Sequence, residues 1–155
     1  MGVRPKDESV AFYDHADRSI SVSILRNGRL SPTLNDSKNF LSVLGHESTH
    51  EADDVSGFKE TYLSHSTVYQ KQILSENFSE ATFDFQLGTV GSFANHVYNA
   101  RYNRENGVNE YVSNFNKISK DWKIGDNVVS GSGYPVYYKG QKYIMPVKML
   151  KNPSE

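Results

Sequence analysis

Two histidines and a glutamate stand at a spacing that suits metal chemistry. In the stretch LSVLGHESTHEADD, residues 41–54, His46, Glu47 and His50 form the pattern H-E-x-x-H. Because an α-helix has 3.6 residues per turn, positions i and i+4 lie one above the other on a single face. His46 and His50 can therefore offer two imidazole nitrogens to one metal ion, while Glu47 can reach a metal-activated water. The chemistry that this pattern indicates is metal-assisted hydrolysis.

A catalytic zinc ion usually has three protein ligands and one water, so a third ligand must be found. The longer pattern with a third histidine needs glycine at 53 and histidine at 56, where the chain has Asp53 and Ser56. The chain has no cysteine, which excludes thiolate ligands. A carboxylate is therefore expected. The candidates, in order of preference, are Glu80, Glu76, Asp54 and Asp84. Asp54 could instead fix the tautomer of a ligand histidine.

The first third of the chain predicts a small sheet followed by the helix that bears the motif. Segments 10–13 and 19–24 have strand character and a turn between them, within an expected β-region of 10–30. Asn35, Asp36 and Ser37 are good N-cap residues for a helix over 36–54. Its expected apolar stripe consists of Phe40, Leu41, Val43, Leu44 and Ala52.

The rest of the chain predicts helices over 66–104 and a closing β-hairpin. Residues 75–87 are expected as one helix, with Glu76, Glu80 and Asp84 stacked at i, i+4 and i+8. Gly88 and Gly91 are expected to break it before a further helix. A helix over 109–118 and a loop over 121–126 follow. Residues 134–150 predict a hairpin that turns at Lys139-Gly140. The expected fold class is α+β, in one domain of residues 1–155.

Composition excludes several classes of protein. The formal net charge of −1 argues against a general nucleic-acid binder. No run approaches 18 consecutive apolar residues, so we expect no membrane span. The first ten residues, MGVRPKDESV, lack an apolar core and predict no signal peptide.

A family resemblance rests on two segments. The stretch GHESTH, residues 45–50, is followed about thirty residues later by SEATFDFQ, residues 79–86. Together they resemble the gluzincin-like minimal metallopeptidases among the zincins, and are similar to small metallopeptidase domains of bacterial polymorphic toxins and effectors. The thermolysin-type N-E-x-x-S-D signature is absent. The resemblance implies a zincin-like fold and one Zn²⁺ ion, with His46, His50 and Glu80 as its ligands.

The resemblance also implies a mechanism and partners. Glu47 would act as general base, taking a proton from water and delivering it to the leaving amine. His96, Tyr98 and Tyr102 are candidates for stabilising the oxyanion. The expected substrate is a protein or peptide. A cognate inhibitor or immunity protein and delivery into a target cell are expected by the same analogy.

Two alternative interpretations do not require catalysis. The motif could be two surface histidines on an amphipathic helix. The chain could also be a non-catalytic, partner-binding module on a zincin-like scaffold, using the basic, tyrosine-rich hairpin of residues 134–151. A module that only binds a metal ion does not need Glu47, so the presence of Glu47 favours catalysis. His15 and His65 have no partner at a useful spacing and are expected to be incidental.

Overall fold

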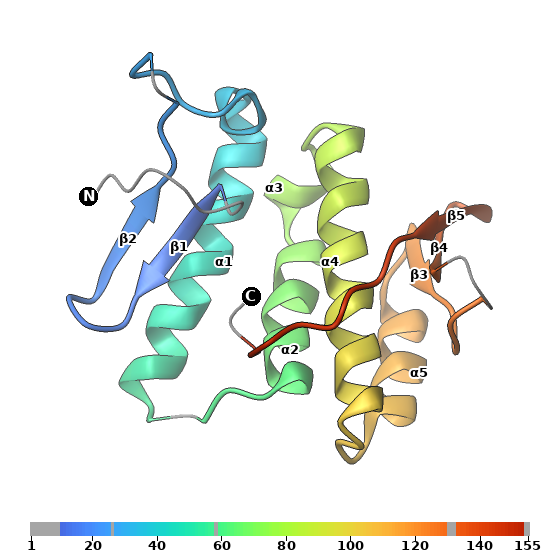
Figure 1. Ribbon diagram of the computed structural model, residues 1–155. Helices are drawn as coiled ribbons and strands as arrows, with labels where there is room; N and C mark the ends of the chain where they lie inside the picture. The colour runs from blue at the N-terminus through green and yellow to red at the C-terminus, as the bar shows by residue number, and fades with distance from the viewer. Residues whose placement is uncertain (1–9, 26, 58, 130–132, 154–155) are drawn as a thin grey trace. The chain divides into compact units, whose positions relative to one another are not determined.

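The computed structural model describes residues 10–25, 27–57, 59–129 and 133–153. Over these residues the chain forms five α-helices, a short 3-10 helix and two small antiparallel sheets (Figure 1). The predicted α+β class is confirmed. The chain divides into two compact units. The first comprises Met1–Lys59 and Leu74–Gln86, and the second comprises Glu60–Ile73 and Leu87–Glu155. The single-domain organisation stays a prediction.

The first unit begins with the predicted hairpin. Strands β1 (Ala11–Asp14) and β2 (Ser19–Val22) pair antiparallel, with Ala11 opposite Val22. A 3-10 helix, η1 (Pro32–Asn35), leads into the long helix α1 (Ser37–Val55). The hairpin lies against α1, as the blue strands beside the cyan helix show in Figure 1.

Helix α1 starts where the sequence predicts, because Asp36 caps it. The Asp36 carboxylate accepts hydrogen bonds from the backbone N–H groups of Lys38 and Asn39, at 2.9 and 3.0 Å. The predicted apolar stripe is wrong, however. Of its members only Val43 is fully buried, and Leu41 is 44% exposed. The buried face is mostly polar and consists of Asn39, Ser42, Val43, His46, Glu47 and His50.

The helix predicted over 75–87 is interrupted. Helix α3 (Glu76–Ser79) ends early, and α4 (Phe83–Tyr102) begins after a short break. The break arises because the N–H of Thr82 bonds the side-chain oxygen of Asn39 on α1, at 3.0 Å, rather than a carbonyl one turn back. The Asn39 amide in turn donates to the Thr82 hydroxyl at 3.0 Å. The three carboxylates of this region therefore do not stack along one helix.

In the second unit, α4 runs on through the glycines that were expected to break it. A Cβ at Gly91 would lie 2.5 Å from Cε of Met145, so the glycine allows a close approach rather than ending the helix. Phe93 on α4 packs against Phe115 of α5 (Val108–Ile118), with ring centroids 4.6 Å apart. Both rings are fully buried, which places them in the core of this unit.

Helix α2 (Tyr62–Ile73) begins four residues earlier than predicted. Glu105 accepts hydrogen bonds from the backbone N–H groups of Tyr62 and Leu63, at 3.0 and 2.9 Å. Thr61 and Ser64 also bond each other's backbone N–H groups in a reciprocal cap. These contacts satisfy the first turn of the helix, so residue 65 is already helical.

The chain closes in a three-stranded sheet. Strands β4 (Tyr134–Tyr138) and β5 (Gln141–Met145) form the predicted hairpin, with positive φ at Lys139 and Gly140. The expected loop over 121–126 contains an additional strand, β3 (Trp122–Ile124), which pairs with β4. A strand of three residues is too short to show an alternating pattern from which it could be predicted.

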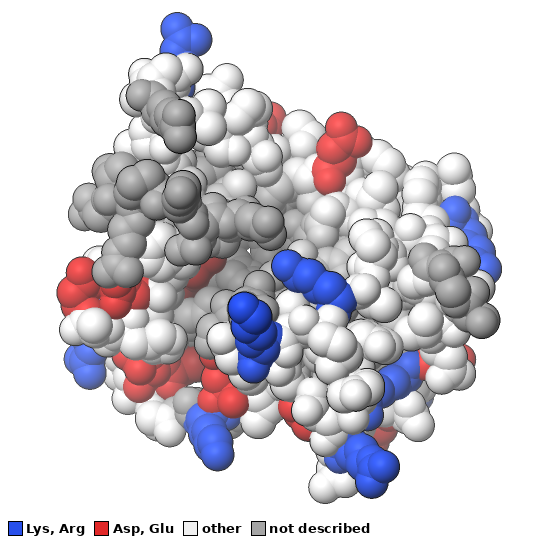
Figure 2. Space-filling model, viewed as in Figure 1, with Lys and Arg blue, Asp and Glu red and all other residues white. Residues whose placement is uncertain are grey.

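Among the described residues no helix is both long and apolar enough to cross a membrane. Figure 2 shows basic and acidic side chains on the same face, with uncharged ones between them.

Candidate metal centre

Helix α1 brings its two motif histidines together. The Nε2 atoms of His46 and His50 lie 3.2 Å apart, and the ring centroids are 5.0 Å apart. Each residue is only 7% exposed. Leucine side chains would stabilise a core at these two positions better than imidazoles do. The burial of two imidazoles on one helix face therefore indicates a functional site rather than packing alone. The alternative of two surface histidines does not fit this burial.

The pair has a separation that suits a metal ion. Two nitrogen ligands at about 2.0–2.1 Å from one tetrahedral ion are roughly 3.3–3.4 Å apart. The observed 3.2 Å between the Nε2 atoms of His46 and His50 is close to that value. Neutral imidazole nitrogens are also ligands that zinc and other first-row divalent ions accept well. The donor set therefore fits the expected metal.

Glu47 adjoins this pair and is also 7% exposed. A buried carboxylate beside two imidazoles is costly unless it has a partner or a task. Its place in the chain, directly after His46, is the one that the motif predicts for a general base.

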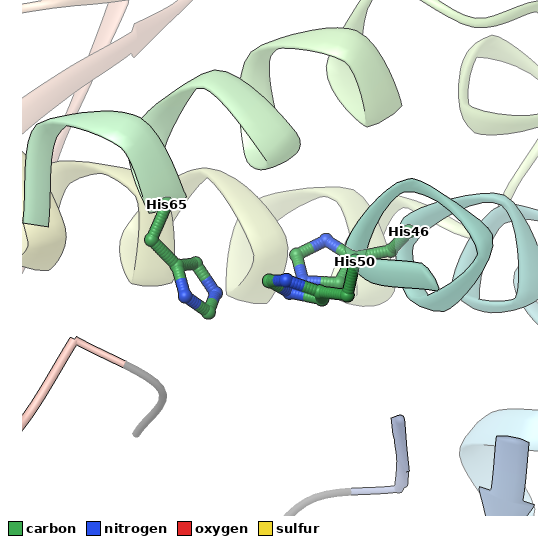
Figure 3. Close-up of side chains that lie close together, drawn as sticks. All are labelled: His46, His50 and His65. Carbon is green, nitrogen blue, oxygen red and sulfur yellow. The ribbon is translucent and has the colours of Figure 1, made fainter. Parts of the chain in front are cut away.

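One group of side chains could hold a metal ion. Among the described residues, His46, His50 and His65 are the one group of three or more His, Cys, Asp or Glu residues with this property, with one ligand atom from each within 4.8 Å of the others. Figure 3 shows the three side chains, His46 and His50 from α1 and His65 from α2. His65 is on α2 and is buried. The expectation that His65 is incidental does not agree with this grouping.

Within its own unit, His65 contacts two side chains, Glu60 and His96. Its Nδ1 lies 2.8 Å from Oε1 of Glu60. Its ring stacks on that of His96, with centroids 4.3 Å apart and planes inclined by 18°.

His96, a candidate for oxyanion stabilisation, is engaged elsewhere. Its Nδ1 and Nε2 lie 2.9 and 3.1 Å from the carbonyl oxygens of Ser92 and Pro153. Burial, with the nearby His65 ring, lowers the pKa of His96 to about 4. The ring is therefore neutral at pH 7, and its single N–H has a backbone acceptor. In this conformation both ring nitrogens of His96 face backbone carbonyl groups.

The carboxylates that were favoured as third ligands do not join the group. Glu80 forms an ion pair with Lys38, and its side chain is 48% exposed. The hydrogen bond from this pairing raises the pKa of Lys38. Glu76 is exposed in the first turn of α3, and Asp84 in the first turn of α4.

Asp54 holds the hairpin to the end of α1. Its carboxylate accepts from the Tyr13 hydroxyl at 3.1 Å and lies 3.1 Å from Nδ1 of His15. The His15 contact is the main cause that lowers the pKa of Asp54, and the Tyr13 hydrogen bond acts in the same direction. Both contacts give Asp54 and His15 a structural role that spacing alone did not reveal.

The two tyrosine candidates lie on the last turns of α4. The rings of Tyr98 and Tyr102 are 6.5 Å apart, and Tyr102 is 65% exposed. Tyr98 is half-buried.

One candidate ligand was missed by sequence reasoning, and a local signal for it existed. Thr61, with Ser64 three residues later, is an N-cap pattern that would have started α2 at residue 62. That start places His65 on a helix. The fourteen residues between His50 and His65 carry no periodic signal, so spacing alone could not group these two histidines.

Buried imidazoles with an adjacent carboxylate on one helix are the arrangement of a metal-dependent hydrolase. Residues 2–127 match the model of a family described as metallopeptidase toxin 2. The chain belongs to this family of metallopeptidase toxins. Strands β4 and β5 lie beyond the matched residues. Comparison with curated proteins and with solved structures gave no match.

Proposed function

We propose that this chain is a zinc-dependent peptidase domain of a toxin that cleaves a protein substrate. One observation carries the proposal: α1 buries His46, Glu47 and His50 on a face that is almost wholly polar. Such a face weakens the core, so it is expected where chemistry requires it. Membership of a metallopeptidase toxin family supports the same assignment.

The proposed ligands of one zinc ion are His46, His50 and His65. Three histidines and an open fourth position form a known catalytic zinc set. Their grouping supports this choice over Glu80, which has a basic partner in Lys38. Glu80 remains the alternative third ligand that a variant must test.

The chemistry follows from the chain's own residues. A bound zinc ion would supply Lewis acidity, lowering the pKa of a water and polarising a carbonyl. Glu47 would accept a proton from the attacking water and return it to the leaving amine. Burial of Glu47 keeps the carboxylate away from bulk water, which strengthens its interaction with a nearby proton.

We propose the biological setting from family membership. A peptidase toxin requires a protein target, a cognate inhibitor that protects the producing cell, and delivery into a target cell. We propose that the cognate inhibitor covers the α1 residues and so blocks substrate access.

Removing the metal should abolish proteolysis reversibly. Incubating the purified chain with a bacterial cytosolic extract should create new protein amino termini, which mass spectrometry detects. Pretreating the chain with a chelator should remove these termini, and adding zinc back should restore them, because holding zinc is the role given to the histidines. An extract without the chain is the control. New termini that persist under chelation, or no new termini from the zinc-loaded chain, would contradict the proposal.

A further inference from the structure

His65 is held by an acid that no motif pointed to. Glu60 precedes α2 and places Oε1 2.8 Å from Nδ1 of His65. An ionised carboxylate can only accept a hydrogen bond, so Nδ1 is the nitrogen that carries the proton. Nε2 of His65 then carries the lone pair that a metal ligand requires. The Glu60 side chain is 25% exposed and that of His65 only 5%, so the contact is shielded from water.

The orientation of the His65 ring is fixed from a second direction. The His96 ring stacks on it with the centroids 4.3 Å apart. The centroid of the Tyr69 ring, one turn along α2, lies 5.3 Å from that of His65. The neutral His96 ring can donate its single N–H to one of two backbone carbonyl groups, that of Ser92 or that of Pro153. These ring contacts add to the Glu60 contact in orienting His65.

We propose that Glu60 is a positioning residue, which sets the tautomer and direction of His65 so that Nε2 is presented to the metal. This inference rests on the proposed function, because it takes His65 as a ligand. Ligand histidines typically donate their other N–H to a carboxylate or carbonyl, and loss of that acceptor commonly weakens metal binding by about 10–100-fold.

Zinc titration of the full chain against a chromophoric chelator tests the proposal. Glu60→Ala should raise the zinc Kd about 10–100-fold, whereas Glu60→Gln, which retains an acceptor oxygen, should raise it less. Glu110→Ala, at an exposed position on α5, removes the same charge and should leave the Kd unchanged.

A tautomer measurement separates positioning from general stability. Long-range ¹H–¹⁵N spectra of the zinc-free chain should show the His65 proton on Nδ1 in the wild type and in Glu60→Gln. In Glu60→Ala the proton should move largely to Nε2, the more common tautomer of a ring without such an acceptor. A wild-type proton on Nε2 would overturn the proposal.

The role of His65 is tested in the same titration. If His65→Ala loses zinc while Glu60→Ala binds like the wild type, the positioning role is wrong and the ligand assignment stands. If His65→Ala itself binds zinc like the wild type, the ligand assignment fails instead.

Discussion

Replacing Glu47 by glutamine should reduce kcat about 10²–10⁴-fold, the usual contribution of a positioned general base. Glutamine has almost the same shape but cannot accept the proton. Because Glu47 is not one of the proposed ligands, the variant should retain its zinc. Turnover on a cleavage site mapped in the bacterial extract, with zinc content measured on the same sample, checks both parts.

A matched variant is available on the same helix. Glu51→Gln changes the same charge one turn further along α1, at an exposed position, and should retain full activity. If Glu47→Gln cleaves as fast as the wild type, Glu47 is not the base. A variant that loses zinc together with activity would instead indicate that the carboxylate helps to hold the metal.

Truncating Phe93 to alanine should lower the free energy of unfolding by about 3–5 kcal/mol. The Phe93 side chain is fully buried and packs on Phe115, so its loss leaves a cavity between α4 and α5. Small domains have total stabilities of about 5–15 kcal/mol, so this change removes a large part of the total. Urea unfolding monitored by circular dichroism provides the measurement.

Tyr102 supplies the comparison for this prediction. It is an aromatic residue on the same helix but is 65% exposed, and Tyr102→Ala should change the unfolding free energy by no more than about 0.5 kcal/mol. Equal urea midpoints for Phe93→Ala and the wild type would mean that the packing between α4 and α5 does not stabilise the fold.

Features fixed by neighbouring residues could be predicted from the sequence. The spacing of His46, Glu47 and His50 is a property of one helix, and Asp36 marks where that helix begins. The two-residue turn at Lys139-Gly140 is equally local, since both residues adopt positive φ. These predictions needed no knowledge of the rest of the fold.

Features that depend on distant contacts could not be predicted. The break before α4 exists because Asn39 bonds Thr82, forty-three positions away. Gly91 does not end the helix: it lies within α4, where the missing side chain leaves room for Met145 from the distant strand β5. The early start of α2 depends partly on hydrogen bonds to Glu105. The helical conformation of His65 depends on that same early start.

The third ligand shows the same limit in the site itself. The i, i+4, i+8 spacing of Glu76, Glu80 and Asp84 favoured an acid, but that spacing has meaning only on a continuous helix. Once the helix is interrupted, Glu80 pairs with Lys38 instead. We therefore propose His65, a histidine without any motif spacing, as the third ligand.

Zinc content is the most direct test of the central claim that this chain holds a metal through three histidines. Elemental analysis of the purified, zinc-equilibrated chain should find about one zinc per molecule. His65→Ala should lose it, and Glu80→Ala should retain it. A wild-type chain without bound divalent metal would contradict the account, and loss of zinc from Glu80→Ala but not from His65→Ala would assign the third ligand to the acid.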